Sequence, residues 1–74
     1  MKPIKHYVKF QLDIFREQCN FTEEELQYFD MKAKDYMDVR IATALMISEG
    51  KVAKLSKSVR AKMKTVINSG KYPL

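Results

Sequence analysis

The sequence predicts a compact all-α domain, and three observations lead to this fold class. Apolar residues recur at helical spacing over most of the chain, start and stop signals for helices separate these segments, and the links between them are three or four residues long. With 74 residues the chain holds one domain. We therefore expect residues 1–74 to form a single bundle of three to four helices, with its core at 21–68.

The first helix is expected over about residues 5–18. Apolar and polar residues alternate here as in a strand, from Val8 to Ile14, but a helical stripe fits as well. A lone strand would leave its backbone groups unpaired, which favours the helix. The stripe consists of Ile4, Val8, Leu12, Phe15 and Cys19, and is widened by Tyr7, Phe10 and Ile14.

The second helix has the strongest start signal, the segment FTEEEL. Thr22 and Glu25 have the spacing of a capping box, and Phe21 and Leu26 have the spacing of a hydrophobic staple. The three consecutive acids lie where the helix dipole favours negative charge. We expect a helix over about 23–34, with an apolar face of Leu26, Phe29, Met31 or Ala33, and Tyr36.

A short third helix is expected to start at Asp38 as its N-cap and to end before Met46 and Ile47. Its inward face would consist of Val39, Ile41, Ala42 and Leu45. Ser48 then caps a long C-terminal helix that runs from Glu49 to about residue 68, where Asn, Ser and Gly form the stop.

The long helix has two opposite faces. At about 100° per residue, its apolar stripe is Val52, Leu55, Val59, Met63 and Val66, which predicts the core face. The opposite face carries Gly50, Lys54, Lys57, Ala61 and Lys64, flanked by Ala53 and Ser58. A glycine in the first turn costs about 1 kcal/mol relative to alanine, and a solvated surface does not need one. Small residues let a helix backbone approach another surface, and lysines contact phosphates.

Charge is distributed unevenly along the chain. The net charge is +5, but residues 39–74 carry eight basic residues and one acid, whereas 21–38 carry two basic residues and six acids. A basic C-terminal half suggests a polyanionic partner such as nucleic acid. The chain has no apolar stretch of membrane-spanning length and no secretory signal pattern, and its single Cys19 cannot form an internal disulfide. We expect a cytoplasmic protein.

Residues 21–63 resemble the helix-turn-helix domains of LuxR-type response regulators and of sigma-factor region four. The shared pattern begins with an aromatic residue or Leu followed by Thr, then a Glu and a pair of apolar residues. Ile-Ala, Leu, Ile-Ser and Val follow in that order, and a basic tail ends the pattern. It is carried here by Phe21-Thr22, Glu25, Phe29, Met31, Ile41-Ala42, Leu45, Ile47-Ser48, Val52 and Lys62-Met63. The chain differs at Met46 and Tyr36, where these domains often have Gly, and at Lys51, where they usually have Thr.

The resemblance implies that the helix from Glu49 is a recognition helix for the major groove of double-stranded DNA. The groove-facing residues would be Ser48, Glu49, Gly50, Ala53, Lys54 and Lys57, and the phosphate contacts Lys51, Arg60, Lys64 and Arg40. Ser48 has a second interpretation as a cap alone. Glu49 either reads a cytosine amino group or complements the helix dipole, and the second role is favoured. Lys32 is expected to lie away from this face.

No enzyme, cofactor or metal site is indicated. His6 and Cys19 are the only residues of their types, and a zinc site normally needs three or four ligands. No nucleophile–base pair and no Gly-rich phosphate loop is visible. The residues therefore favour a binding protein.

The leading hypothesis is sequence-specific DNA binding by a small transcriptional regulator of bacterial or phage type. It would act as a homodimer, with Val66, Ile67, Tyr72 and Leu74 as unpartnered apolar surface. The alternative is a helix-turn-helix-shaped module that binds RNA polymerase or another transcription protein without reading DNA. Binding to a membrane surface is disfavoured, because the narrow apolar stripe is needed for the core.

Overall fold

The computed structural model describes all 74 residues and is all-helical. A short 3₁₀ helix, η1 (Ile4–His6), precedes four α-helices: α1 (Lys9–Gln18), α2 (Glu23–Ala33), α3 (Asp38–Leu45) and α4 (Glu49–Asn68). The predicted fold class is thus confirmed, including the long C-terminal helix. None of these helices combines the length and apolarity needed to cross a lipid bilayer.

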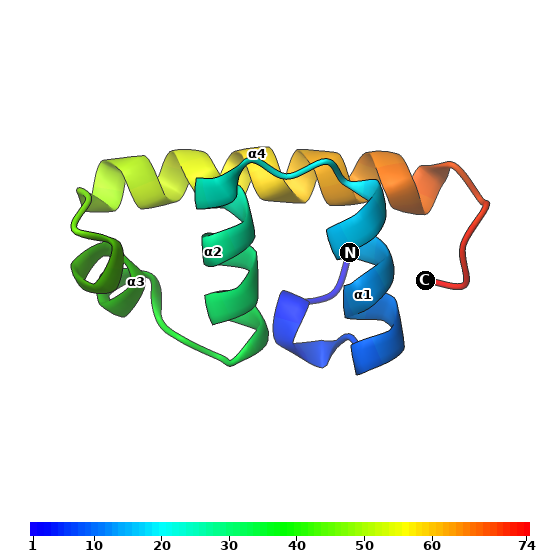
Figure 1. Cartoon of the computed structure of the whole chain (residues 1–74), viewed down its shortest axis with the longest axis horizontal. Helices are drawn as coiled ribbons and strands as arrows, with labels where there is room; N and C mark the ends of the chain where they lie inside the picture. Colours follow the sequence, from blue (N-terminus) through cyan, green and yellow to red (C-terminus); the bar gives the residue numbers. More distant parts are fainter.

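Helix α4 runs along the whole length of the molecule, and the other helices lie on one side of it (Figure 1). Helices α1 and α2 meet α4 at a steep angle, and α3 is seen nearly end-on beside the start of α4. The side of α4 that faces these helices is the predicted stripe: Val52, Leu55, Val59, Met63 and Val66 are all buried. One long face of α4 is consequently left without a partner in the fold.

The core is built where the short helices meet α4. Its largest fully buried side chains are Tyr28, Phe15, Phe29, Ile41 and Met63. The rings of Phe15 and Phe29 lie 6.1 Å apart and join α1 to α2, while Tyr7 packs edge-on against Phe15 at 5.0 Å. Edge-to-face rings contribute about 0.5–1.5 kcal/mol each beyond the area that they bury.

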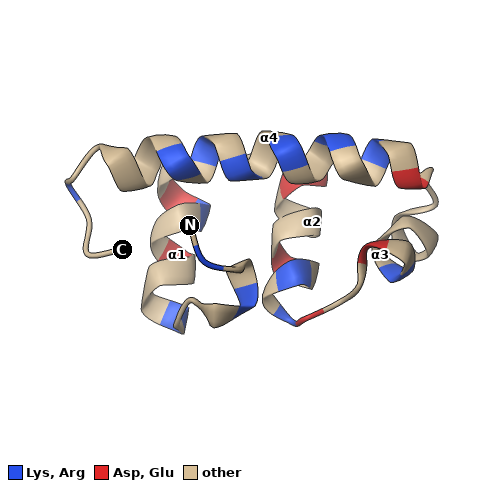
Figure 2. Cartoon of the chain, turned by 180° about the vertical axis from the view of Figure 1, so that it is seen from behind, with Lys and Arg blue, Asp and Glu red and all other residues tan.

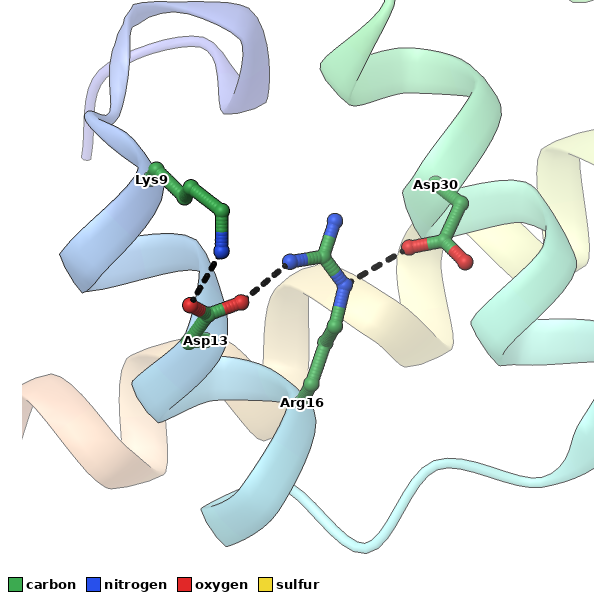
Figure 3. A network of polar contacts seen from close by, with 4 residues as sticks. All are labelled: Lys9, Asp13, Arg16 and Asp30. Carbon is green, nitrogen blue, oxygen red and sulfur yellow. Dashed lines mark hydrogen bonds and ion pairs between the residues drawn. The ribbon is translucent and has the colours of Figure 1, made fainter.

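An ion network also links α1 to α2 (Figure 3). The Arg16 guanidinium donates to Asp13 and to Asp30, both at 2.8 Å, and lies 5.5 Å from the centre of the Phe29 ring. Lys9 donates to the second oxygen of Asp13 at 3.0 Å. The hydrogen bond and charge of Lys9, with smaller contributions from Arg16, hold the pKa of the half-exposed Asp13 carboxyl below its ordinary value against desolvation, which raises it.

The start signals of α2 and α4 are confirmed in atomic detail. The Thr22 hydroxyl accepts the Glu25 N–H at 3.2 Å, and the Glu25 carboxylate accepts the Thr22 N–H at 2.8 Å. The Ser48 hydroxyl accepts the Lys51 N–H at 3.1 Å and caps α4. At the C-terminal end, Gly70 has a φ of 69°, a left-handed conformation that glycine adopts at little cost.

The expected helix over 5–18 is wrong in its first third. Extended residues Tyr7 and Val8 separate η1 from α1, and the Val8 N–H donates to the Gln11 side chain at 3.2 Å. This break shifts the helical phase, so Val8 and Phe10 are 62% and 61% exposed although the stripe predicted them to be buried. The rest of that stripe packs in or against the core.

Two details of α2 and α3 also differ from the prediction. Phe21 stacks on Phe29 at 5.1 Å, and Leu26 is only half-buried and takes no part in the core, whereas Tyr28 is fully buried. The N-cap of α3 is Met37, because the Asp38 carboxylate accepts from Lys32 and Tyr28 of α2 instead of capping. Val39 is 52% exposed, because at about 100° per residue it lies roughly 110° from the centre of the face that Ile41, Ala42 and Leu45 form.

The apolar residues that were predicted to support a homodimer have partners inside the chain. Val66 is buried, and Ile67, Tyr72 and Leu74 pack against the core. The C-terminal tail folds back over α1, where the Gln11 side chain donates to the Pro73 carbonyl at 3.3 Å. Val66 is therefore taken up by the core, whereas Ile67, Tyr72 and Leu74 keep part of their surface exposed, and the homodimer stays a prediction.

Candidate nucleic-acid interface

The unpartnered face of α4 forms a ridge of small and basic residues. We call it the α4 ridge and define it as Gly50, Ala53, Lys54, Lys57, Ala61 and Lys64, all of which are exposed. Its members were predicted from the sequence, and their exposure follows directly from the burial of the opposite stripe. From Gly50 to Lys64 the ridge covers about 21 Å at 1.5 Å per residue.

Positive charge on α4 is mostly uncompensated. Seven ion pairs occupy Lys5, Lys9, Arg16, Lys32, Lys51 and Lys62. None of them involves Lys54, Lys57, Arg60 or Lys64. Basic segments follow one another along α4, and its only acidic segment lies at its N-terminal end (Figure 2). Three of the cations without an acidic partner, Lys54, Lys57 and Lys64, thus share the face of α4 that no other helix covers.

The first turn of α4 is open at Gly50. A Cβ atom added there would meet only the Ser48 hydroxyl, at 3.8 Å, so the fold does not require a glycine. Glu49 is exposed and begins the helix, where its charge complements the dipole. Ser48 acts as the N-cap, so its capping role is confirmed, and its position in a DNA interface stays a prediction.

A groove borders the ridge on one side, between the start of α2 and the first turns of α4. It has a volume of about 680 Å³ and is lined by Thr22, Glu25, Ser48, Gly50, Lys51, Lys54, Leu55 and Ser58. Lys51, predicted as a phosphate contact, lies 3.3 Å from the Glu24 carboxylate, with both side chains about half exposed. A phosphate that approached Lys51 would have to compete with this acid.

The remaining predicted site residues lie on other surfaces. Arg40 is on α3, with its guanidinium 4.6 Å from the centre of the Tyr36 ring. Arg60 is nine residues beyond Lys51 and therefore points to the opposite flank of α4. The chain brings Ser48, Glu49, Lys51 and the α4 ridge together on one helix, and Arg40 stands apart from them.

Sequence reasoning missed a buried polar network beside the ridge. Glu25 is 4% exposed, and its carboxylate accepts from Lys62 at 2.6 Å and from the Ser58 hydroxyl. Burial raises the pKa of Glu25, but the hydrogen bonds from Lys62, Ser58 and the Thr22 N–H outweigh it and lower the pKa to about 2. Ser58 and Lys62, which the sequence assigned to the outer face and the basic tail, hold α2 against α4 instead.

Cys19 lies beside this network and is buried. Desolvation raises the pKa of its thiol to about 11, against a lowering effect of Lys62 and with a further raising effect of Glu25. The thiol is therefore protonated at neutral pH. No group of three or more His, Cys, Asp or Glu side chains is placed to hold a metal ion.

Lys32 does not lie apart from the basic residues of α4. It lines a small cleft together with Arg60, Lys5 and Asp35 on the flank of α4, away from the α4 ridge as expected but beside one of the predicted phosphate contacts. The two residues enter the lining from different elements, Lys32 from α2 and Arg60 from α4. Its sequence position after an acidic segment gave no signal of this.

Comparison with known proteins adds no assignment, since no protein-family model, no curated protein and no solved structure matches the chain.

Proposed function

We propose that the chain binds double-stranded DNA, with the α4 ridge in the major groove. The observation that carries this proposal is the segregation of charge: Lys54, Lys57 and Lys64 have no acidic partner and share their face with Gly50, Ala53 and Ala61. A helix is about 10–12 Å across and the major groove about 12 Å wide, so small side chains favour deep entry.

The roles within the ridge follow from side-chain chemistry. Lysine ammonium groups neutralise phosphates and also donate to the N7 and O6 atoms of guanine. The methyl group of Ala53 is suited to contact with the methyl group of thymine, and Gly50 lets the backbone approach the base edges. Gly50 and Ala53 would therefore lie against the base edges, Lys54 and Lys57 would reach both bases and phosphates, and Lys64 would hold the backbone.

The turn between α3 and α4 supports the resemblance to helix-turn-helix domains. Ala42 is 5% exposed where α3 packs against α4, as a small residue at a helix crossing should be. Met46 has φ 57° and ψ 44°, the left-handed conformation that explains why such turns often carry glycine at this position. We infer a small cytoplasmic transcriptional regulator of bacterial or phage type.

A protein-interaction module is the second candidate, and a specific surface favours it. Met37, Val39 and Met46 are 72%, 52% and 91% exposed at the two ends of α3. Exposed apolar side chains in one region are typical of contacts with another protein. Under this alternative, RNA polymerase or another transcription protein would bind α3, and the α4 ridge would not need to read DNA.

The test is a comparison of two double variants that remove the same charge. Lys54→Ala/Lys57→Ala should weaken binding to duplex DNA by about tenfold or more, because two phosphate-neutralising cations are lost. Lys9→Ala/Lys34→Ala should bind as the unaltered chain does, because these lysines lie at the ends of α1 and α2 that point away from α4 (Figure 1).

Exposed substitutions usually change stability within about ±0.5 kcal/mol, so thermal melting should be nearly the same for all these proteins. Equal DNA affinity of the two double variants would contradict the proposal. Absence of duplex binding by the unaltered chain at low salt would do the same and would leave the interaction module as the better explanation.

A homodimer on a palindromic site would double the number of base pairs read. Sedimentation of the chain, free and on DNA, tests this second copy independently of the affinity measurements.

A further inference from the structure

A cleft on the flank of α4 gathers three cations from distant parts of the sequence. We call it the basic cleft; it has a volume of about 260 Å³ and is lined by Pro3, Ile4, Lys5, Lys32, Asp35 and Arg60. These residues come from η1 and the chain before it, from α2 and the turn after it, and from α4. At about 30 Å³ per water molecule, the space is sufficient for a hydrated phosphate group.

Charge in the basic cleft is only partly balanced. Lys5 lies 3.0 Å from the Asp35 carboxylate, which is the one acid in the lining. Lys32 is 25% exposed and reaches Asp38 at 3.2 Å, outside the lining. Arg60 is exposed and has no acidic partner. A free guanidinium next to two ammonium groups is chemically suited to a phosphate, which it can bind through two parallel hydrogen bonds.

The position of the basic cleft relative to the α4 ridge gives it a role. Arg60 follows Lys57 by three residues and therefore lies about 60° around the helix from it, at the border of the ridge. Lys51 borders the ridge on the opposite flank. A helix in the major groove has one phosphate backbone on each side, so these two flanks face the two strands.

We propose that the basic cleft holds a phosphate of one DNA strand when the α4 ridge occupies the major groove. This inference rests on the proposed DNA binding and adds η1 and α2 to the contact surface. Arg60 would bind the phosphate directly, and Lys32 and Lys5 would surround it. The cleft thereby fixes the rotation of α4 about its own axis in the groove.

The variants Arg60→Gln, Lys32→Ala and their combination test this proposal with a short synthetic DNA duplex at several salt concentrations. Each lost phosphate contact should reduce the slope of log K against log salt by about 0.9. Because both residues bind the same phosphate, the combined variant should lose about one contact and not two. Lys9→Ala/Lys34→Ala is the control, and Lys5→Ala provides a second test if Lys32→Ala lowers the melting temperature.

The two proposals fail differently. If Lys54→Ala/Lys57→Ala weakens binding but the cleft variants match the control in affinity and slope, the basic cleft does not hold a phosphate and DNA binding by the ridge stands. A loss of two contacts in the combined variant would also overturn the single-phosphate site. If the unaltered chain does not bind the duplex at low salt, both proposals are wrong.

Discussion

The Lys62 ammonium donates to the Glu25 carboxylate at 2.6 Å and joins the first turn of α2 to α4 across 37 residues of chain. The same ammonium donates to the Asn20 carbonyl at 3.1 Å, and the Ser58 hydroxyl donates to the second carboxylate oxygen. Every polar atom of the buried Glu25 side chain is thus paired. The network fixes α2 against the flank of α4, next to the groove beside the ridge.

Stability should fall in acid because of Glu25. Its pKa is about 2 in the folded chain and 4.5 ordinarily, so the folded state favours the carboxylate. A lowered carboxyl pKa contributes stability above pH 4.5 that is lost as the pH falls through the folded value. The difference corresponds to about 3 kcal/mol at neutral pH. Denaturant unfolding at several pH values between roughly 6 and 2 measures it.

The variant Glu25→Gln provides the comparison for that titration. It removes the charge but keeps an oxygen for the Thr22 N–H, so it should be less stable than the unaltered chain at neutral pH and should converge with it near pH 2. Lys62→Met, which leaves a buried carboxylate without its cation, should cost about 3 kcal/mol or more at neutral pH. A stability difference that does not change with pH would show that Glu25 acts through packing alone.

This network marks the limit of what the sequence predicts. The capping box identified Glu25 as a helix-start residue, and that role is confirmed. Its burial depends on Ser58 and Lys62, which approach only after α2 has packed on α4. No local pattern contains that information, because the partners are 33 and 37 residues away.

Replacing Met46 by glycine should stabilise the chain. Met46 has φ 57° and is 91% exposed, so its side chain contributes little packing while its backbone is in the left-handed region. That conformation costs a non-glycine residue about 1–2 kcal/mol, part of which the greater freedom of glycine in the unfolded chain offsets. We expect a gain of about 0.5–1 kcal/mol in the free energy of unfolding, measured with denaturant.

Ala44→Gly is the matched control for that substitution. Ala44 is exposed, lies in α3 two residues before Met46 and has helical geometry. Glycine there should cost about 1 kcal/mol. If Met46→Gly destabilises as much as Ala44→Gly, the left-handed turn is not strained.

The helices that the sequence predicted well have both a periodic stripe and a polar cap. In α4, Ser48 caps the helix and five apolar residues at helical spacing define one face, so both bounds and the core face are correct. Where the cap signal is absent, the prediction is less accurate. The pattern could not reveal the extended Tyr7 and Val8, because their conformation is set by the packing of Tyr7 on Phe15. Asp38 likewise does not cap α3, because its carboxylate accepts a hydrogen bond from Lys32 instead.

DNA binding should depend strongly on salt. Lys54, Lys57, Arg60 and Lys64 have no acidic partner to release, so each can displace about one counterion from the duplex. Log K against log salt should have a slope near −4. Fluorescence anisotropy with a labelled duplex at increasing salt measures this slope, and a flat dependence would argue against phosphate contacts by α4.

Substitutions at Gly50 should distinguish the approach of the α4 backbone to DNA from the stability of the fold. The space around Gly50 accepts a side chain, since a Cβ atom would meet only the Ser48 hydroxyl at 3.8 Å. Gly50→Ala and Gly50→Leu should therefore both stabilise α4, by up to about 1 kcal/mol. Only leucine adds enough bulk on the α4 ridge to keep the backbone from the base edges. We expect Gly50→Ala to bind duplex DNA nearly as well as the unaltered chain, and Gly50→Leu to bind it much more weakly despite its higher melting temperature. Equal affinity of the two variants would mean that the first turn of α4 stays outside the groove.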